Sequence, residues 1–316
     1  MIQNRKAFIV GIKSIKLNKD EKKFLKRYKP WGVILFTRNI KSLKQTKNLT
    51  DSIKKIFNDR NYPILIDQEG GKINRLKNLI SFDNLSAEFF GDLYLKDQKK
   101  FKIFFKLFID KTSFILKNLG ININTTPVLD LRIKKSSNVI GDRSFSRDPK
   151  VVSNIGAYCI DLFHLNSIGS VIKHIPGHGS AKVDSHKFTP HVNKKINYLI
   201  KNDFYPFKNQ KSFFAMTSHV IFSALDKKET VTHSKKVINF IRHKLNFKNI
   251  IISDDLSMKS LKHSLSENTK KTFLAGCNIA LHCNGSMQEM NVVAINSPVV
   301  NKFIVKKTSE FYKILS

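Results

Sequence analysis

Residues 234–258 read SKKVINFIRHKLNFKNIIISDDLSM, a polar stretch with periodic apolar residues that runs into a short β-branched segment. In the first half the apolar residues recur at intervals of three and four, which predicts an amphipathic helix. In the second half the isoleucine run 250–252 predicts a buried strand that ends at Asp254 and Asp255. Because side chains alternate along a strand, only one of these carboxylates can face inward, and we expect the other to turn outward and cap the next segment.

The same helix-and-strand unit recurs along the chain, which is typical of parallel strands joined by crossover helices. Eight segments have the composition of strands: Ala7–Ile12, Gly32–Phe36, Pro63–Asp67, Ile123–Val128, Ser170–Ile175, Phe214–Val220, Asn249–Asp254 and Ile279–Cys283. Helical periodicity is found at Ser42–Arg60, Lys99–Leu119, Pro149–Leu165, Ser234–Leu245 and Glu267–Ala275. Eight alternations favour a closed (β/α)8 barrel of the TIM type over an open sheet, because closure removes both edge strands. No linker or repeat divides the sequence, so residues 1–316 are predicted to form a single α/β domain.

The charge balance bears on the class of partner. The chain has 56 basic and 24 acidic residues, a net charge of +32, which raises nucleic acid or an anionic membrane as a partner. Only nine of the basic residues are arginines, and the lysines are spread along the chain instead of forming a basic arm. We therefore predict a solvated, lysine-rich surface on a monomer, with no nucleic-acid and no membrane partner.

Cysteine usage and hydropathy bear on the compartment. Cys159, Cys277 and Cys283 have no repeating spacing, so they predict core packing in a reducing compartment rather than a disulfide framework. The apolar run Ala7–Ile12 is too short for a signal peptide, and no segment is long enough to cross a bilayer. These features predict a soluble cytoplasmic protein.

Functional residues of such a barrel are expected just after the carboxyl ends of its strands. After the third strand, Asp67 is followed by two glycines and Arg75, which is either a polar clamp or a solvated turn. After the fourth strand, Asp130 places another carboxylate at the rim. Arg143 in the following loop is either a hydrogen-bonding fork for substrate oxygens or a partner of Asp142.

The loop after the fifth strand, KHIPGHGSAKVDSH (Lys173–His186), is the richest in functional side chains. Its three histidines and Asp184 are good metal ligands, although glycine and proline within the spacing disfavour a preformed tetrahedral cage. In a second interpretation, Asp184 orients His186, two residues further on, as a general acid and base. A rigid loop with surface histidines is the third interpretation.

These segments together predict a polar barrel mouth with several carboxylates, two arginines, one lysine and the histidine-rich loop. After the sixth strand, His219 is expected to be a hydrogen-bonded histidine beneath the site. The sequence has no phosphate-binding loop of the Walker or dinucleotide type. Carboxylates beside many hydrogen-bond donors suit a sugar ring, whose hydrolysis needs an acid for the leaving oxygen and a carboxylate facing an oxocarbenium-like centre.

Seven blocks of the sequence resemble, in unchanged order, the bacterial β-N-acetylhexosaminidases of glycoside hydrolase family 3. The blocks are GVILFTRNI (Gly32–Ile40), IDQEGGKINRL (Ile66–Leu76), NTTPVLDL (Asn124–Leu131), IGDRSFSRDP (Ile140–Pro149), KHIPGHG with DSH (Lys173–His186), AMTSHVIFSALD (Ala215–Asp226) and IIISDDLSM (Ile250–Met258). The resemblance covers most of the chain and implies a single (β/α)8 barrel, with no metal and no organic cofactor.

By this resemblance, Asp254 would be the nucleophile of a retaining mechanism, and His186, oriented by Asp184, would be the acid and base. Five further residues match positions that hydrogen-bond the hydroxyls and the acetamido group of N-acetylglucosamine: Asp67, Arg75, Arg143, Lys173 and His174. The implied function is an exo-acting β-N-acetylglucosaminidase that removes terminal N-acetylglucosamine from peptidoglycan fragments during cell-wall recycling.

Two alternative functions remain open on the sequence. A β-N-acetylglucosaminide phosphorylase is one, because an imidazole repels incoming phosphate less than a carboxylate would. A non-catalytic glycan- or nucleic-acid-binding barrel is the other, and the intact Asp184, His186 and Asp254 argue against it. Departures from the family pattern, such as Ile175 for Phe and Lys72 for Arg, remove no proposed catalytic atom and bear on acceptor preference.

Overall fold

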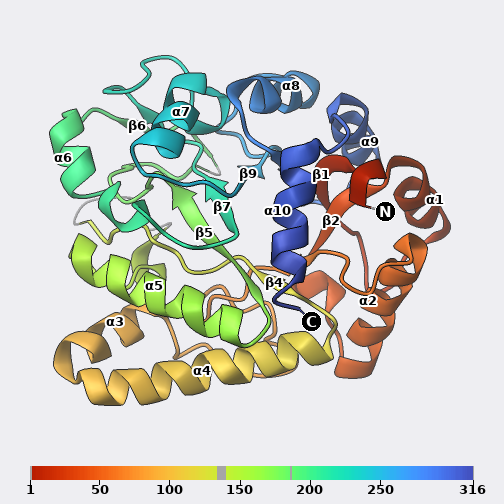
Figure 1. The fold of residues 1–316 in the computed structure, drawn as a ribbon, viewed down its shortest axis with the longest axis horizontal. Helices are drawn as coiled ribbons and strands as arrows, with labels where there is room; N and C mark the ends of the chain where they lie inside the picture. The colour runs from red at the N-terminus through yellow and green to blue at the C-terminus, as the bar shows by residue number, and fades with distance from the viewer. Residues whose placement is uncertain (1, 134–139, 186, 316) are drawn as a thin grey trace.

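Eight parallel strands close into a barrel in this computed structural model, which describes residues 2–133, 140–185 and 187–315. The barrel strands are β1 (Lys6–Gly11), β2 (Pro30–Leu35), β3 (Ile64–Ile66), β4 (Ile123–Asn124), β5 (Gly169–Ile175), β7 (Phe214–Thr217), β9 (Ile250–Asp255) and β10 (Ile279–His282). Each strand pairs with its neighbours in chain order, and β10 pairs with β1, with Ala280 opposite Phe8, to complete the circle. The predicted (β/α)8 barrel is confirmed (Figure 1).

Helices surround the barrel and connect its strands (Figure 1). They are α1 (Lys19–Tyr28), α2 (Leu43–Phe57), α3 (Ala87–Lys96), α4 (Gln98–Asn118), α5 (Pro149–Leu165), α6 (Ile196–Lys201), α7 (Lys235–His243), α8 (Leu265–Ala275), α9 (Met287–Asn296) and α10 (Lys302–Tyr312). Shorter elements are the 3-10 turns η1 (Ile2–Asn4), η2 (Thr37–Asn39), η3 (Gly141–Arg143), η4 (Tyr205–Phe207) and η5 (Val231–His233), and a separate pair of strands, β6 (His191–Val192) and β8 (Ile221–Phe222). Helix α5 begins as its sequence indicates, because the Asp148 side chain accepts the Lys150 backbone N–H and Pro149 occupies the first turn.

Most barrel strands end within one residue of the predicted position, but β4 and β7 end three or more residues earlier than the sequence predicts. Strand β4 ends at Asn124 instead of Val128. Pro127 has no N–H with which to continue the ladder, and Val128 forms only an isolated bridge with Lys173. Strand β7 ends at Thr217 instead of Val220. The residues beyond these two ends form loops at the carboxyl end of the barrel, where side chains are free to serve a site.

Apolar side chains pack on both faces of the strands. Inside the barrel, Ile9, Leu65 and Ile252 belong to one cluster, and the opposite strand faces pack against the surrounding helices in another. Helix α10 closes the end of the barrel at which the strands begin, where Phe311 packs edge-on against Phe214 with ring centroids 5.2 Å apart. The open end is therefore the one at which the strands finish.

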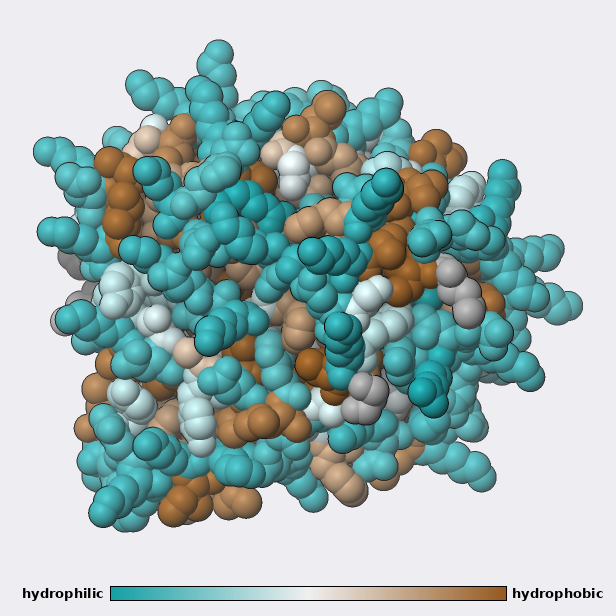
Figure 2. Space-filling view, in the orientation of Figure 1, coloured by the Kyte–Doolittle hydropathy of each residue, from teal (hydrophilic) through white to brown (hydrophobic). Residues whose placement is uncertain are grey.

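The surface agrees with a lysine-rich composition. Figure 2 shows hydrophilic side chains over most of one face, with separate apolar areas between them. Among the described residues, no helix combines the length and hydropathy that a bilayer-spanning segment needs. Cys159 and Cys277 are buried, as predicted, whereas Cys283 is only partly buried and borders a pocket at the open end of the barrel.

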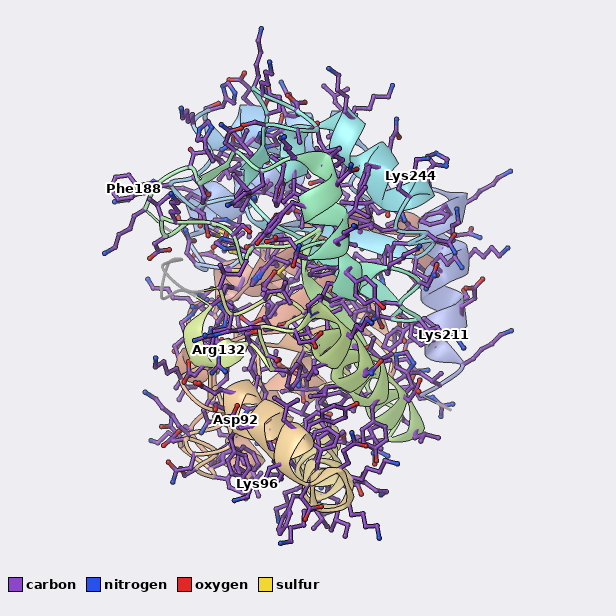
Figure 3. The ribbon with its side chains drawn as sticks, turned by 90° about the vertical axis from the view of Figure 1, so that its left-hand side faces the viewer. Asp92, Lys96, Arg132, Phe188, Lys211 and Lys244 are labelled. Carbon is purple, nitrogen blue, oxygen red and sulfur yellow. The ribbon has the colours of Figure 1, made fainter. Side chains whose placement is uncertain are left out.

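Helix α3 approaches the segment after η3 so closely that only glycine fits at position 91. A Cβ atom on Gly91 would lie 1.6 Å from the carbonyl oxygen of Phe145, a backbone atom that cannot rotate away. Arg132, after β4, lies beside the same helix, with its Nη2 atom 3.8 Å from Asp92 Oδ1 (Figure 3). These contacts fix η3, and with it Arg143, relative to the barrel.

We expect Gly91→Ala to destabilise the protein by about 1–3 kcal/mol, because overpacking against Phe145 outweighs the roughly 1 kcal/mol of helix propensity that alanine gains over glycine. Urea denaturation measures the change. Gly156→Ala in α5 is the matched control, since its added Cβ atom meets the Leu129 side chain, which can adjust more readily than a backbone carbonyl can move. Equal losses of stability in the two variants would contradict a rigid contact at Gly91.

Candidate active site

One pocket at the open end of the barrel brings together most of the predicted site residues. Six of them line it: Asp67, Arg75, Arg143, Lys173, His174 and Asp254. Two of them follow β3, one is the last residue of η3, two lie within β5 and one lies within β9. These elements are far apart in sequence and meet at the carboxyl ends of the strands. Ser185, next to Asp184, lines the pocket as well, whereas His186 lies outside the described residues.

Lys173 is the buried centre of an ion network in this pocket. Its Nζ atom lies 3.1 Å from Asp67 Oδ1, 2.6 Å from Glu69 Oε1 and 3.0 Å from Thr125 Oγ1. Only 3% of the Lys173 side chain is exposed. Thr125 also donates to Asp67, and Arg75 Nη2 lies 3.4 Å from Asp67 Oδ2. The clamp of Asp67 and Arg75 is therefore formed, and Lys173 joins it to a second carboxylate.

Glu69 is the charged residue of this network that sequence reasoning missed. Arg143 donates from Nε to Glu69 Oε2 at 2.8 Å and from Nη2 to Oε1 at 2.9 Å, a bidentate pair. Arg143 thus binds Glu69 rather than Asp142, whose carboxylate lies 3.5 Å from Lys72. The signal that could have identified Glu69 is its place at a strand exit, two residues after Asp67 and just before the glycine pair.

The cations of the network keep both carboxylates ionised. Burial raises the pKa of Glu69, but Arg143 and Lys173 outweigh burial and lower this pKa to about 2. The pKa of Asp67 is likewise held well below its usual value, because Lys173 and Arg75 outweigh its burial. The pocket therefore presents fixed acceptors and fixed donors together, which suits a ligand rich in hydroxyl and amide groups.

His174 is held by Asp130, the carboxylate that sequence reasoning placed at the rim of the barrel. Asp130 is in fact fully buried, and its Oδ2 atom lies 2.6 Å from His174 Nδ1. Burial raises the pKa of Asp130, but the neighbouring His174 outweighs burial and lowers it. An ionised carboxylate only accepts hydrogen bonds, so Nδ1 carries a proton and the ring is fixed in one orientation. This pairing is the physical reason that Asp130 can be buried.

The two aspartates at the end of β9 point in different directions, as the alternation of side chains along a strand predicts. Asp254 lines the pocket, and its Oδ1 atom accepts the Asp255 backbone N–H at 2.8 Å. Asp255 turns away, and its Oδ1 atom accepts backbone N–H groups from Ser257 at 3.1 Å and Cys283 at 3.3 Å. The second carboxylate therefore caps the following turn and joins it to the end of β10.

A chain of neutral hydrogen bonds supports Asp254 from behind. The Asp254 backbone N–H donates to Thr217 Oγ1 at 3.3 Å, and the Thr217 and Thr232 hydroxyls are 2.7 Å apart. His219 Nδ1 lies 2.7 Å from Thr232 Oγ1, and His219 Nε2 lies 3.0 Å from the Asp255 carbonyl oxygen. Burial lowers the pKa of His219, which favours the neutral ring. His219 is thus the hydrogen-bonded histidine that the sequence predicts beneath the site.

The loop after β5 returns to the pocket at Ser185. His178 Nε2 lies 3.0 Å from Ser185 Oγ, and both residues line the pocket. Phe188 donates its backbone N–H to the Asp184 carbonyl at 2.9 Å, and its side chain projects at the outer edge of the molecule (Figure 3). The pairing of Asp184 with His186 stays a prediction, because His186 lies outside the described residues.

Metal binding was one interpretation of the histidine-rich loop. Within residues 2–133, 140–185 and 187–315, no group of three or more His, Cys, Asp or Glu side chains is arranged to hold a metal ion. Since His186 is not among these residues, the expectation that the protein needs no metal stays a prediction.

Known proteins match both the sequence and the fold. The family model for the glycosyl hydrolase family 3 N-terminal domain matches residues 3–307. A β-hexosaminidase from Haemophilus influenzae is 32% identical over 286 residues, covering 88% of this chain and 79% of that protein. A β-hexosaminidase from Nitrosomonas eutropha is 34% identical over 263 residues, covering 80% of this chain and 73% of that protein.

Among solved structures, NagZ from Neisseria gonorrhoeae in complex with N-trifluoroacetyl-D-glucosamine has a TM-score of 0.88 and 26% identity. The match covers 98% of this chain and 90% of that chain. Because a family model spans almost the whole chain and relatives above 30% identity cover most of it, the chain belongs to glycosyl hydrolase family 3 and is a glycosidase of that family.

Proposed function

We propose that the chain is a retaining exo-β-N-acetylglucosaminidase, a β-N-acetylhexosaminidase whose single barrel domain, residues 1–316, carries the whole activity. The observation that carries this proposal is the pocket that Asp254 shares with Asp67, Lys173 and His174. Two further findings support it: relatives above 30% identity are named β-hexosaminidases, and the similar gonococcal NagZ was solved with an N-acylated glucosamine.

Asp254 is the nucleophile in this proposal. Its carboxylate attacks the anomeric carbon while the bond to the leaving oxygen breaks, and a glycosyl-enzyme forms that water later opens with net retention. The hydrogen bond from the Asp255 backbone to Asp254 Oδ1 and the Thr217 hydroxyl behind its amide support this role, because they fix the carboxylate at the end of β9. Asp255 is occupied in capping the following turn.

His186, oriented by Asp184, is the acid and base. It gives its proton to the leaving oxygen in the first step and takes a proton from the incoming water in the second. An imidazole with an ordinary pKa of about 6.5 is poised for both transfers near neutral pH, whereas a glutamate would need its pKa raised. The position of Ser185 on the pocket wall supports an approach of this loop to the sugar.

The remaining polar residues bind the sugar. Asp67 accepts and Lys173 donates hydrogen bonds to ring hydroxyls, while Arg75, Arg143 and His174 complete the contacts to the hydroxyls and the acetamido group. The ion network supports this role because it holds each group in place before substrate arrives. Preorganised groups of this kind lose little conformational freedom on binding.

The natural substrate in this proposal is a peptidoglycan fragment that ends in N-acetylglucosamine, cleaved in the cytoplasm during cell-wall recycling. The enzyme acts as a monomer, needs no metal or organic cofactor, and has no nucleic-acid or membrane partner. The carboxylate and cation pairs of the pocket support a polar glycan substrate.

The nucleophile is tested with Asp254→Asn and an aryl β-N-acetylglucosaminide. We expect turnover to fall by roughly three orders of magnitude or more, because the amide cannot form the glycosyl-enzyme. Asp255→Asn is the matched control: its remaining oxygen can still cap Ser257, so turnover should stay within about tenfold of the parent. Near-parental turnover in Asp254→Asn would reject the assignment.

The acid is tested by varying the leaving group in His186→Ala and Asp184→Asn. We expect both variants to lose more turnover on N,N′-diacetylchitobiose, whose sugar leaving group needs a proton, than on a dinitrophenyl glycoside, which leaves unprotonated. General acid catalysis contributes roughly 10²–10⁴-fold, and this sets the expected gap between the two substrates for His186→Ala. Equal losses on both substrates would show that His186 is not the acid.

The role of Glu69 is tested by stability against pH. Because the pKa of Glu69 is about 2 in the folded protein and about 4.3 in an unfolded chain, ionised Glu69 stabilises the fold above pH ~4.3, and this contribution is lost as the pH falls toward 2. We expect Glu69→Gln to cost about 3 kcal/mol at pH 7, because Lys173 and Arg143 lose a buried partner, and the difference from the parent should narrow in acid.

Chemical denaturation between pH 3 and pH 7 measures this difference. Asp142→Asn is the control, since its partner Lys72 is 72% exposed and a surface pair contributes less than about 1 kcal/mol. A pH-independent loss in Glu69→Gln would refute the ion-network explanation.

A further inference from the structure

Asp203 is a buried acidic residue that the proposed mechanism does not use. It follows α6 and is 1% exposed. Its carboxyl group accepts the Ser180 backbone N–H at Oδ1 and the Ser180 hydroxyl at Oδ2, both at 2.8 Å. Ser180 lies in the loop after β5, four residues before Asp184. Both hydrogen-bond donors of this serine are therefore directed to one buried side chain.

No Lys, Arg or His side chain pairs with Asp203 in the part of the chain that the structure describes. Burial raises the pKa of Asp203, and the hydrogen bonds from Ser180 offset only part of this rise. Burying an acidic group without a cation is unfavourable, and an apolar side chain of similar size is often at least as stabilising. The carboxyl group is therefore better explained by the position that it gives to Ser180 than by a gain in stability.

The residues just before Ser180 pack tightly against two other segments. A Cβ atom on Gly177, whose φ is +149°, would lie 2.9 Å from the carbonyl oxygen of Asp203. A Cβ atom on Gly179 would lie 2.5 Å from the carbonyl oxygen of Leu131, in the segment after β4. The start of the loop is therefore held between these two stretches of backbone.

The segment that contains Asp203 is itself fixed by aromatic packing. Phe204 is fully buried, and its ring packs edge-on against Phe222 of β8, with ring centroids 5.0 Å apart. Strand β8 pairs in turn with β6, the next strand along the chain after the loop. Both ends of residues 181–190 are therefore attached to one packed unit, at Asp203 on one side and at β6 on the other.

Further contacts lead from Ser180 to the candidate active site. His178, two residues before Ser180, has its Nε2 atom 3.0 Å from Ser185 Oγ. The ring centroids of His178 and His174 are 5.8 Å apart. His174, His178 and Ser185 all line the pocket that contains Asp254. A displacement of Ser180 would therefore reach the pocket wall at the residue next to Asp184.

We propose that Asp203 is a positioning residue for the proposed acid and base: its two hydrogen bonds to Ser180 hold the loop that carries Asp184 in place for proton transfer to the sugar linkage. Asp203 lies outside the lining of the candidate active site, so it acts through the loop and not on the sugar. The inference rests on the proposed function, because it assumes that this loop supplies the proton.

The dependence on the leaving group separates this role from a purely structural one. Asp203→Ala removes both acceptors of Ser180. We expect its kcat/KM on N,N′-diacetylchitobiose to fall about 100-fold further than its kcat/KM on a dinitrophenyl glycoside, because a misplacement of about 1 Å costs on that order and the dinitrophenyl group leaves without a proton. Asp203→Asn keeps an acceptor for the Ser180 N–H and should recover most of the lost activity.

Asp59→Ala is the matched control. The Asp59 carboxylate also joins distant segments, since it accepts the Tyr312 hydroxyl of α10 at 2.8 Å, but it lies at the end of the barrel where the strands begin. Any loss that this variant causes should be equal on the two substrates. Ser180→Ala removes one of the two hydrogen bonds and repeats the test if Asp203→Ala does not fold; a smaller gap in the same direction is expected.

His186→Ala, measured on the same two substrates, tells failure of this inference apart from failure of the proposed function. A gap in His186→Ala and in Asp203→Ala, with recovery in Asp203→Asn, supports the positioning role. A gap in His186→Ala that is absent from both Asp203→Ala and Ser180→Ala overturns this inference alone. If His186→Ala itself shows no gap, the proposed acid is wrong and the inference falls with it.

Discussion

Two mostly buried carboxylates at the barrel mouth stay ionised because mostly buried cations face them. Glu69 is 6% exposed on its side chain and is contacted by both Lys173 and Arg143, while Asp67 shares Lys173 with it. Removing any one partner would leave a desolvated charge without compensation, so the positions of these groups are interdependent. The four residues come from β5, from η3 and from the segment after β3, and the ion network therefore also sets how these segments sit relative to one another.

The support of Asp254 is of a different physical kind. Its amide joins a chain of neutral groups, the Thr217 and Thr232 hydroxyls and the His219 ring, and burial keeps that ring's pKa low. A cationic ring in the same place would stabilise the carboxylate and so make it a weaker nucleophile, the role proposed for it. Neutral hydrogen bonds fix the direction of the side chain without that electrostatic cost. The barrel mouth thus combines a charged half, proposed to bind the sugar, with neutral hydrogen bonds behind the proposed nucleophile.

The sequence was sufficient for the elements whose causes are local, and insufficient where the cause is a distant partner. The strand positions and the inward direction of Asp254 follow from periodicity and alternation. The N-cap of α5 follows from the residue types at its first turn. Each of these signals lies within a single segment. The pairing of Arg143 with Glu69 and the burial of Asp130 under His174 depend on contacts between residues far apart in the chain, and a local pattern has no information on them. The early end of β4 was readable from Pro127, because the missing N–H is a local property.

Two buried histidines whose pKa values are lowered by burial, His219 and His233, lie in the connection between β7 and α7, and they differ in how completely their rings are hydrogen-bonded. Both ring nitrogens of His219 have partners, in Thr232 and in the Asp255 backbone, whereas Nε2 of His233 has none among the described residues. In this short segment, packing can therefore supply hydrogen-bond partners for both nitrogens of a buried imidazole. Burial favours the neutral form of both rings, but it is the His219 ring that is tied through both nitrogens to the residues behind Asp254.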